Sequence, residues 1–383
     1  MDGRKLPLPV RIFGVLCVVA SAAFIVLIIL VAPRAANYLS QDADLSASIT
    51  VTILFIMLFV CLFGLVALPL VLGIMLFRGR RRFAANLTTA LMALTATTAL
   101  CDILLNGLVV NDIFYALILA LLFFISGYID PSLAGERQLQ RRLRLMEDRS
   151  LEELGEMEGR DLTGKGYVEL NFFNLFWVFI ICCVIGVFIE TIYCFFINGE
   201  LQDRAGLLFG PFSPIYGFGG LLLTLTLNRF YKSNLPIIFL VSAFIGGSFE
   251  YLTSWFMQTA FGIIAWDYSG TWLSIDGRTN GVYMIMWGLL GVFWIKLLVP
   301  GTLKLIVKIP WQLRYTATAV GTVFIAVNIA MTLIAFDCWF ERKSGNAGDV
   351  AIQQFFNDNF DDKWMQNRFQ NMSLYPEDAL RSQ

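Results

Sequence analysis

Long apolar runs separated by short polar segments set the pattern of this 383-residue chain. A helix needs roughly 20 apolar residues to cross the ~30 Å hydrocarbon core of a bilayer, whereas barrel strands would show short alternating segments. Each run therefore predicts a transmembrane helix, and the predicted fold class is an all-α integral membrane protein. Nine helices are predicted, over residues 12–32, 50–77, 84–104, 113–129, 172–197, 213–228, 235–258, 282–299 and 315–336.

The first apolar run follows Arg4, Lys5 and Arg11, as the core of a signal peptide would. It extends from Ile12 to Val31, which is longer than the roughly 7–15 residues of a signal-peptide core and long enough to cross a bilayer. We therefore predict a retained transmembrane helix here.

Lysine and arginine gather in alternate loops, and loops of this kind face the cytoplasm. With nine helices and a cytoplasmic N-terminus, the inner segments hold 20 of the 28 Lys and Arg residues. The opposite orientation would reverse this asymmetry. The sequence therefore predicts a multi-pass protein of the cell membrane, with its N-terminus in the cytoplasm and its C-terminal tail outside.

The nine helices fall into two groups with a charged segment between them. That segment starts basic and becomes acidic, with Leu and Met at roughly helical spacing, so it is either a solvated helix or a partner-docking surface. The predicted domains are a four-helix membrane bundle (1–130), a charged cytoplasmic linker (131–171), a five-helix membrane domain (172–336) and an acidic outer tail (337–383).

The tail carries an aromatic stripe that predicts a helix near residues 350–371. We expect this helix to fold onto the outer face of the bundle or to bind a second copy of the chain as a homo-oligomer. The residues of the stripe are Phe355, Phe356, Phe360, Trp364 and Phe369.

Composition agrees with a membrane protein, because 57% of residues are hydrophobic and 15% are charged, against about 25% charged in soluble domains. The net charge of −1 gives no indication of a nucleic-acid partner. The chain has no histidine, which is the commonest general base and metal ligand. Its seven cysteines include no CxxC pair, which favours apolar packing over a metal site.

The sequence has no GxxxxGK[ST] nucleotide-binding loop, no HExxH motif and no GxSxG motif. We therefore expect no cofactor, no metal and no enzymatic activity in this chain. If ATP drives the protein, the ATPase must be another chain.

Three ionisable residues fall inside predicted spans, where charge is costly and often functional. Asp102 lies near the outer end of its helix, where it either reaches water or has a role. Glu190 and Glu250 lie deeper, about 10–12 Å below the outer boundary at a rise of about 1.5 Å per residue. They are candidates for ion coupling.

One order of features occurs twice: a helix with a glutamate, an outer loop with an arginine, and a glycine-rich helix. Transporters are often built from repeats, with the site between them. We expect Arg204 to pair with Glu190, and Arg278 to pair with Glu250. The alternative is that these pairs only lock the orientation of the helices.

The segment GPFSPIYG, which runs from Gly210 through Tyr216 to Gly217, is the most unusual in the chain. Pro211 and Pro214 remove backbone donors, and glycine lets helices approach closely. We expect a re-entrant or broken helix here, buried in protein or lining a polar cavity.

On the predicted inner side, residues 301–314 hold Lys304 and Lys308 one helical turn apart, beside apolar residues. This pattern predicts a short amphipathic helix on the cytoplasmic surface. It either lies at the membrane interface or docks a cytoplasmic ATPase.

Several blocks in the second half of the chain resemble the ABC-transporter type IV membrane family, also labelled CmpB. With the glutamate helix around Glu190, they cover roughly residues 172–300, and the resemblance implies a multi-pass permease. The blocks are GPFSPIYGFGGLL (210–222), EYLTSWFM (250–257), WDYS (266–269), DGR (276–278) and WGLLGVFWIKLLVP (287–300).

Three functions stay open at this point. The chain is the permease subunit of a transporter energised by a separate ATPase, or an ion-coupled carrier that uses Glu190 and Glu250. Alternatively it transports nothing and is a scaffold, a sensor or a protein that acts on lipid or envelope precursors. The sequence favours the first and does not indicate a substrate.

Overall fold

The computed structural model describes residues 10–25, 49–78, 81–108, 112–129, 166–345, 348 and 350–382. The chain forms two compact units, Met1–Glu147 and Asp148–Gln383. Within the described residues both units are helical, and the second also contains a two-stranded sheet. Most of the predicted linker, residues 131–165, lies outside the described residues.

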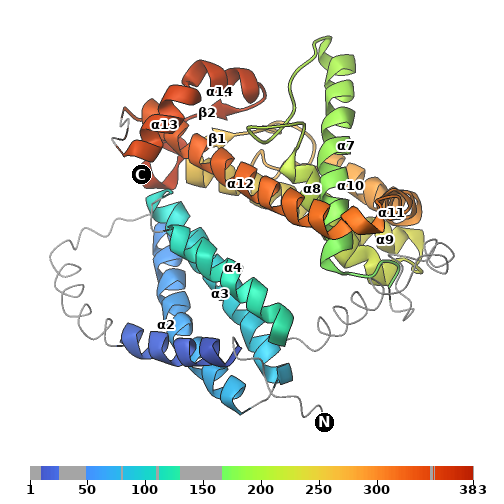
Figure 1. Cartoon of the computed structure of the whole chain (residues 1–383). Coiled ribbons are helices and arrows are strands. Elements are labelled where there is room, and N and C mark those ends of the chain that lie inside the picture. The colour runs from blue at the N-terminus through green and yellow to red at the C-terminus, as the bar shows by residue number, and fades with distance from the viewer. Residues whose placement is uncertain are drawn as a thin grey trace. The chain divides into compact units, whose positions relative to one another are not determined.

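The first unit is a group of apolar helices (Figure 1). They are Val10–Ile25, α2 (Ile49–Phe77), α3 (Arg81–Asn106) and α4 (Asp112–Ile129). Leu72 of α2, Leu91 of α3 and Leu122 of α4 belong to one buried cluster. The first helix packs closely on α2, because a side chain at Gly73 would meet Val18 at 2.6 Å.

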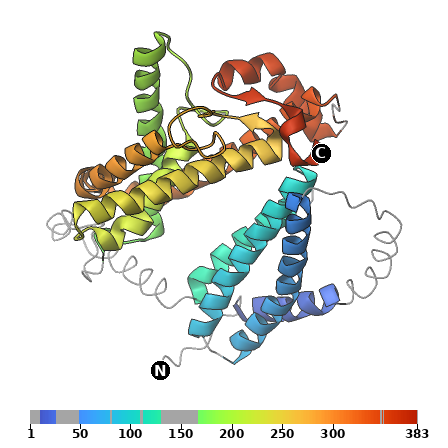
Figure 2. The same ribbon diagram turned by 180° about the vertical axis from the view of Figure 1, so that it is seen from behind.

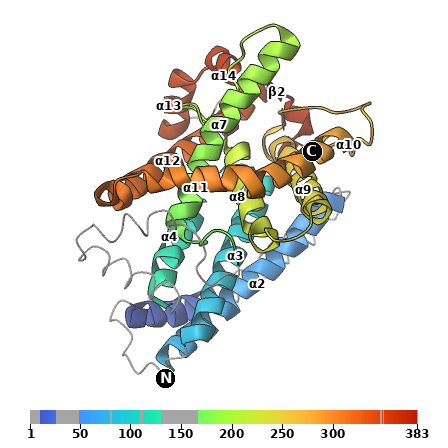
Figure 3. The ribbon, with the colours of Figure 1, turned by 90° about the vertical axis from the view of Figure 1, so that its right-hand side faces the viewer.

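Before its C-terminal tail, the described part of the second unit contains six α-helices. They are α7 (Phe172–Asn198), α8 (Pro214–Leu227), α9 (Leu235–Phe261), α10 (Gly281–Phe293), α11 (Val299–Val307) and α12 (Trp311–Lys343). A 3₁₀ turn, η1 (Asn228–Phe230), follows α8. A π-helical turn, η2 (Trp294–Leu298), joins α10 to α11 without a break. Figure 3 shows α7 crossing α12, where Trp177 donates a hydrogen bond to Thr318 at 3.0 Å.

Six helices in the described part of the chain are long and apolar enough to cross a bilayer. They are Ile56–Phe77, Phe83–Asn106, Phe172–Ile197, Leu235–Phe261, Gly281–Ile306 and Thr316–Lys343. The other three predicted spans are helical but short: Val10–Ile25, Asp112–Ser126 and Pro214–Leu227. The chain is therefore a helical multi-pass membrane protein, and length and apolarity support six of the nine predicted spans.

The spanning helices carry large apolar side chains on their outer surfaces. Phe59 of α2, Phe196 of α7 and Phe244 of α9 are 77%, 79% and 69% exposed. Water would disfavour so much exposed apolar surface, whereas lipid accepts it. The exposed faces therefore agree with helices that lie in a bilayer.

The C-terminal tail folds back onto the second unit. It forms α13 (Ala351–Asn359), α14 (Asp362–Arg368), β2 (Ser373–Leu374), η3 (Pro376–Asp378) and η4 (Leu380–Ser382). β2 pairs antiparallel with β1 (Ile263–Ile264), which follows α9 directly; Figure 2 shows this pairing beside the red C-terminal segment.

The single helix predicted near residues 350–371 is interrupted after α13. The break occurs because the Asp361 side chain accepts a hydrogen bond from the Trp364 backbone N–H at 2.7 Å and so caps a new helix. Phe369 is fully buried, with its ring 4.8 Å from that of Phe336. The tail thus packs on its own unit, which is one of the two arrangements predicted.

Candidate functional site

Glu190 of α7 forms the ion pair that the sequence predicts. The Arg204 guanidinium contacts one carboxylate oxygen through Nη2 at 2.7 Å and donates a hydrogen bond from Nε at 2.9 Å. The hydroxyl of Tyr216, from α8, donates to the other oxygen at 2.6 Å. The charge of Glu190 is therefore compensated, and both oxygens are bonded.

Glu250 of α9 is more deeply buried, with 6% of its surface exposed. Tyr268 donates a hydrogen bond to one carboxylate oxygen and Thr279 to the other, both at 3.0 Å. The Trp287 indole of α10 interacts with the same carboxylate. Each of these partners is neutral.

The predicted pair between Arg278 and Glu250 is wrong. Arg278 donates to the Gln258 side chain at 2.6 Å, and its guanidinium lies 5.8 Å from the centre of the Tyr251 ring. The turn before Arg278 explains the direction of its side chain, because Asp276 has φ 50° and Gly277 has φ 67°. This left-handed pair directs Arg278 away from the carboxylate and leaves Thr279 facing it.

Burial in the loop between α9 and α10, together with the nearby Glu250 carboxylate, raises the pKa of Tyr268 well above its usual range. The phenol is therefore a neutral hydrogen-bond donor at physiological pH. The Tyr283 ring stacks on it, with centroids 4.4 Å apart. This stacking fixes the hydroxyl of Tyr268 over Glu250.

The repeat predicted from the sequence has a structural counterpart. A side chain at Gly186, one turn before Glu190, would overlap the Tyr216 ring. A side chain at Gly246, one turn before Glu250, would overlap the Trp287 ring. In each hairpin, a glycine thus lets an aromatic residue of the next helix reach the glutamate.

The two glutamates lie at different distances from the ends of their helices. Glu190 lies 7 residues before the end of the span Phe172–Ile197, and Glu250 lies 11 residues before the end of Leu235–Phe261. At about 1.5 Å per residue these positions are roughly 10 Å and 16 Å from the helix ends. The difference arises because α9 continues past its predicted end to Phe261.

The start of α8 lies deep along α7, as predicted for a broken or re-entrant segment. The Ser213 N–H donates to the Cys183 carbonyl at 3.3 Å, and Cys183 lies near the middle of the span of α7. Pro214 then occupies the first turn of α8, and Gly210 has φ 75°. Close packing continues in α8, where a side chain at Gly217 would overlap Cys183.

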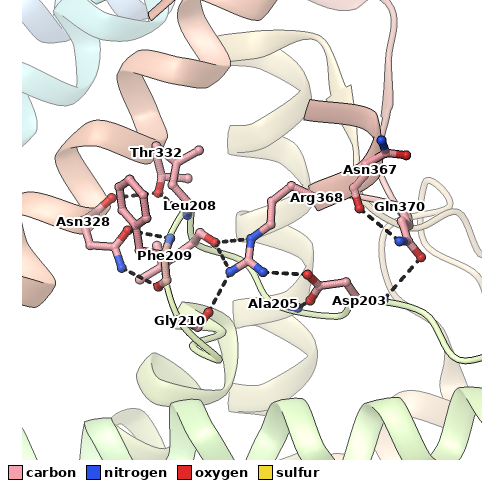
Figure 4. Close-up of polar contacts among 11 residues, drawn as sticks. Asp203, Ala205, Leu208, Phe209, Gly210, Asn328, Thr332, Asn367, Arg368 and Gln370 are labelled. Atoms are coloured by element: carbon pink, nitrogen blue, oxygen red, sulfur yellow. Dashed lines mark hydrogen bonds and ion pairs between the residues drawn. The ribbon is translucent and has the colours of Figure 1, made fainter. Parts of the chain in front are cut away.

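Three side chains bond to the backbone of residues 207–210, which precede α8 (Figure 4). Asn328 of α12 accepts from the Phe209 N–H at 3.2 Å and donates to its carbonyl at 2.7 Å. Thr332, one turn later, accepts from the Leu208 N–H at 3.1 Å. Non-helical backbone at membrane depth needs such partners, because lipid offers none.

The third of these side chains, Arg368 of the tail, was not predicted. It donates to the carbonyl oxygens of Leu207 and Gly210 and pairs with Asp203 at 2.6 Å. The tail arginine therefore holds the same loop that carries Arg204.

The remaining predicted residues do not join these sites. Asp102 belongs to the first unit, where it accepts a hydrogen bond from Asn106 at 2.6 Å. Lys304 and Lys308 are exposed. The short amphipathic helix predicted over 301–314 is present in part: α11 ends at Val307, and a turn then leads into α12. At its start, α11 continues the helix from α10 through η2.

No group of His, Cys, Asp or Glu suited to a metal ion occurs among the residues that the structure describes. Each described cysteine is buried with a free thiol.

Residues 177–333 match the family described as "Putative ABC-transporter type IV". The resemblance predicted for 172–300 is confirmed, and the match extends further, through most of α12. This ABC-transporter type IV segment contains both glutamates, the deep loop and the Asn328–Thr332 pair. The chain is thus a transporter-related membrane protein. No curated protein and no solved structure matches it.

Proposed function

We propose that this chain is the membrane-embedded permease subunit of a transporter whose energy comes from a separate cytoplasmic ATPase. The match of residues 177–333 to the ABC-transporter type IV family carries the proposal. The same segment holds a buried carboxylate, Glu250, a partly buried one, Glu190, and a non-helical loop that reaches the middle of α7. Polar groups and interrupted helices inside a helical membrane domain are the usual parts of a transport site.

An exposed basic surface supports docking of a partner subunit. The Lys296 ammonium donates to the Tyr231 carbonyl, which brings the turn between α8 and α9 beside η2. Exposed basic side chains gather on these elements and on α11, and would meet an acidic surface of an ATPase. They are Arg229, Lys232, Lys296, Lys304 and Lys308.

In this proposal the three shorter helices complete nine spans in two bundles, in the cell membrane. The N-terminus and the basic surface face the cytoplasm, and the tail lies outside. Labelling with a membrane-impermeant thiol reagent tests the orientation, since the described native cysteines are buried. Lys363→Cys should react from outside in intact cells, and Lys308→Cys only after the membrane is opened. Labelling of both from the same side would contradict this topology.

Gentle purification from native membranes tests the proposed function. We expect a stoichiometric cytoplasmic ATPase to co-purify and to be lost when Lys304 and Lys308 are both changed to Glu. Lys363→Glu, a single charge reversal of the same kind at an exposed position on α14, is the control and should retain the ATPase.

Purification of the folded chain without any ATPase would overturn the proposal. Transport by the chain alone in vesicles would then identify a carrier. Failure to transport would leave a scaffold, a sensor or a lipid-acting protein.

A further inference from the structure

The two hairpins of the second unit hold their glutamates in different electrical states. Arg204 neutralises Glu190 at 2.7 Å, whereas Glu250 receives hydrogen bonds from the hydroxyls of Tyr268 and Thr279. Glu250 is also the more buried of the two. An isolated buried carboxylate is costly, and a proton is the simplest cation that removes its charge.

The loop between α9 and α10 is built to deliver hydroxyl groups to Glu250 while Arg278 faces elsewhere. Thr279 contacts the carboxylate, and its neighbour Arg278 bonds to Gln258. The Arg278 carbonyl accepts a hydrogen bond from the Trp266 indole at 2.9 Å, which fixes this part of the loop. The separation of the arginine from Glu250 is therefore a stable feature of the fold.

We propose that Glu250 is a proton-binding site of this permease, whereas Glu190 is a fixed structural ion pair. The inference deepens the proposed function and rests on it. A carboxylate oxygen of Glu250 forms an O–H bond with a proton delivered by water on the side of the 265–281 loop. The hydroxyl that had donated to that oxygen then turns to accept, and the proton returns to water on release.

The tight packing around the Glu250 carboxylate favours a proton over a larger cation. Both carboxylate oxygens already have a hydroxyl at 3.0 Å, and Trp287 packs against Gly246 beside them. A proton adds no volume to this arrangement. It also leaves every donor in place, because a hydroxyl can accept as well as donate.

The groups around Glu250 carry no charge that would compete with it for a proton. The titratable side chains that interact with it are the phenols of Tyr268, from the loop, and Tyr283, from α10. Tyr251, the neighbour of Glu250 on α9, donates instead to the Asp276 carboxylate at 2.8 Å. Asp267 is fully exposed, and hydrogen bonds from Ser269 lower its pKa, so it stays ionised in the loop.

Infrared difference spectroscopy of the full chain in lipid vesicles tests the inference, with changes of pH as the only perturbation. We expect the carbonyl absorption of protonated carboxylic acids to grow as pH falls. One component of it, the Glu250 band, should be absent in Glu250→Gln and present in Glu190→Gln. Persistence of the band in folded Glu250→Gln, or its loss only in Glu190→Gln, would overturn the assignment. A response to sodium ions without this band would overturn it too.

Two conservative variants keep the test decisive if Glu250→Gln fails to fold. Tyr268→Phe removes one hydrogen bond to the charged carboxylate, so the midpoint of the band should rise by about one pH unit. Tyr251→Phe removes a hydroxyl that bonds to Asp276 instead and should leave the midpoint unchanged. Equal midpoints in all three proteins would contradict the proposal. The measurement uses no ATPase, so its outcome is separate from that of the co-purification.

Discussion

The guanidinium of Arg368 donates two hydrogen bonds to the carbonyl oxygen of Leu207, at 2.8 and 2.6 Å, although 161 positions separate the two residues. Leu207 lies in the loop that carries Arg204, the partner of Glu190. The tail therefore stabilises a loop that reaches into the membrane domain. Because this contact joins the last part of the chain to the glutamate site, the tail is part of the architecture of that site.

Replacing Arg368 with Ala should loosen this loop. The carbonyls of Leu207 and Gly210 would lose a charged donor, so the free energy of unfolding should fall by about 2–3 kcal/mol. Thermal unfolding in detergent checks the change, with Lys363→Ala on the exposed face of α14 as the control. Equal stability of the two variants would mean that the loop holds its shape without the tail.

Replacing Asn328 with Leu should destabilise the same loop from the side of α12. The Phe209 N–H and carbonyl would both be left without their partner, which costs about 2–5 kcal/mol in total. Val327→Leu is a matched control, because Val327 is adjacent on α12 and 52% exposed. A similar unfolding temperature for both variants would show that other groups satisfy the loop.

The packing of the tail should weaken in acid. Partial burial alone would raise the pKa of Asp362. Hydrogen bonds and charges from Arg342 and Lys343 outweigh this effect and hold that pKa below its usual value. A carboxylate with a lowered pKa stabilises the folded state above its unfolded pKa, about 4, and loses this contribution as pH falls through the folded value. Protease cleavage of the tail should thus accelerate below about pH 4.

Asp362→Asn should flatten this dependence on pH, because the amide does not titrate. Asp358→Asn, at an exposed position on α13, should keep the wild-type profile. Loss of the pH effect in Asp358→Asn instead would assign it to a different carboxylate.

Six of the spans and the first glutamate pair could be predicted from the sequence because their causes are local. Apolar runs define the helices, and Arg204 is 14 positions from Glu190, within one hairpin. The pairing of Asn328 with the backbone of Phe209 has a weaker local signal, since Asn328 and Thr332 lie one turn apart in an apolar helix. The contact of Arg368 with Leu207 has no local sequence signal, because no periodicity links a tail to a distant loop.

The direction of Arg278 could not be predicted for a different reason. Counting basic residues identifies a suitable partner for Glu250, but backbone dihedral angles decide which of two neighbours faces inward. Asp276 adopts φ 50°, a conformation that few non-glycine residues adopt, and Thr279 then occupies the position expected for the arginine. Sequence reasoning therefore identified the acidic residue correctly and assigned it the wrong partner.

The close contact at Gly246 should be essential for the second hairpin. A methyl group added by Gly246→Ala would overlap the Trp287 ring, which also packs against Gly219 of α8. Such overpacking costs about 1–3 kcal/mol, and it should also move Trp287 relative to Glu250.

Gly301→Ala is the matched control, since a side chain there meets open space, and alanine favours a helix by about 0.5–1 kcal/mol. We expect a lower unfolding temperature and altered tryptophan fluorescence for Gly246→Ala, and an unchanged or higher temperature for Gly301→Ala. Equal unfolding temperatures for the two variants would mean that α9 and α10 do not pack closely at Gly246.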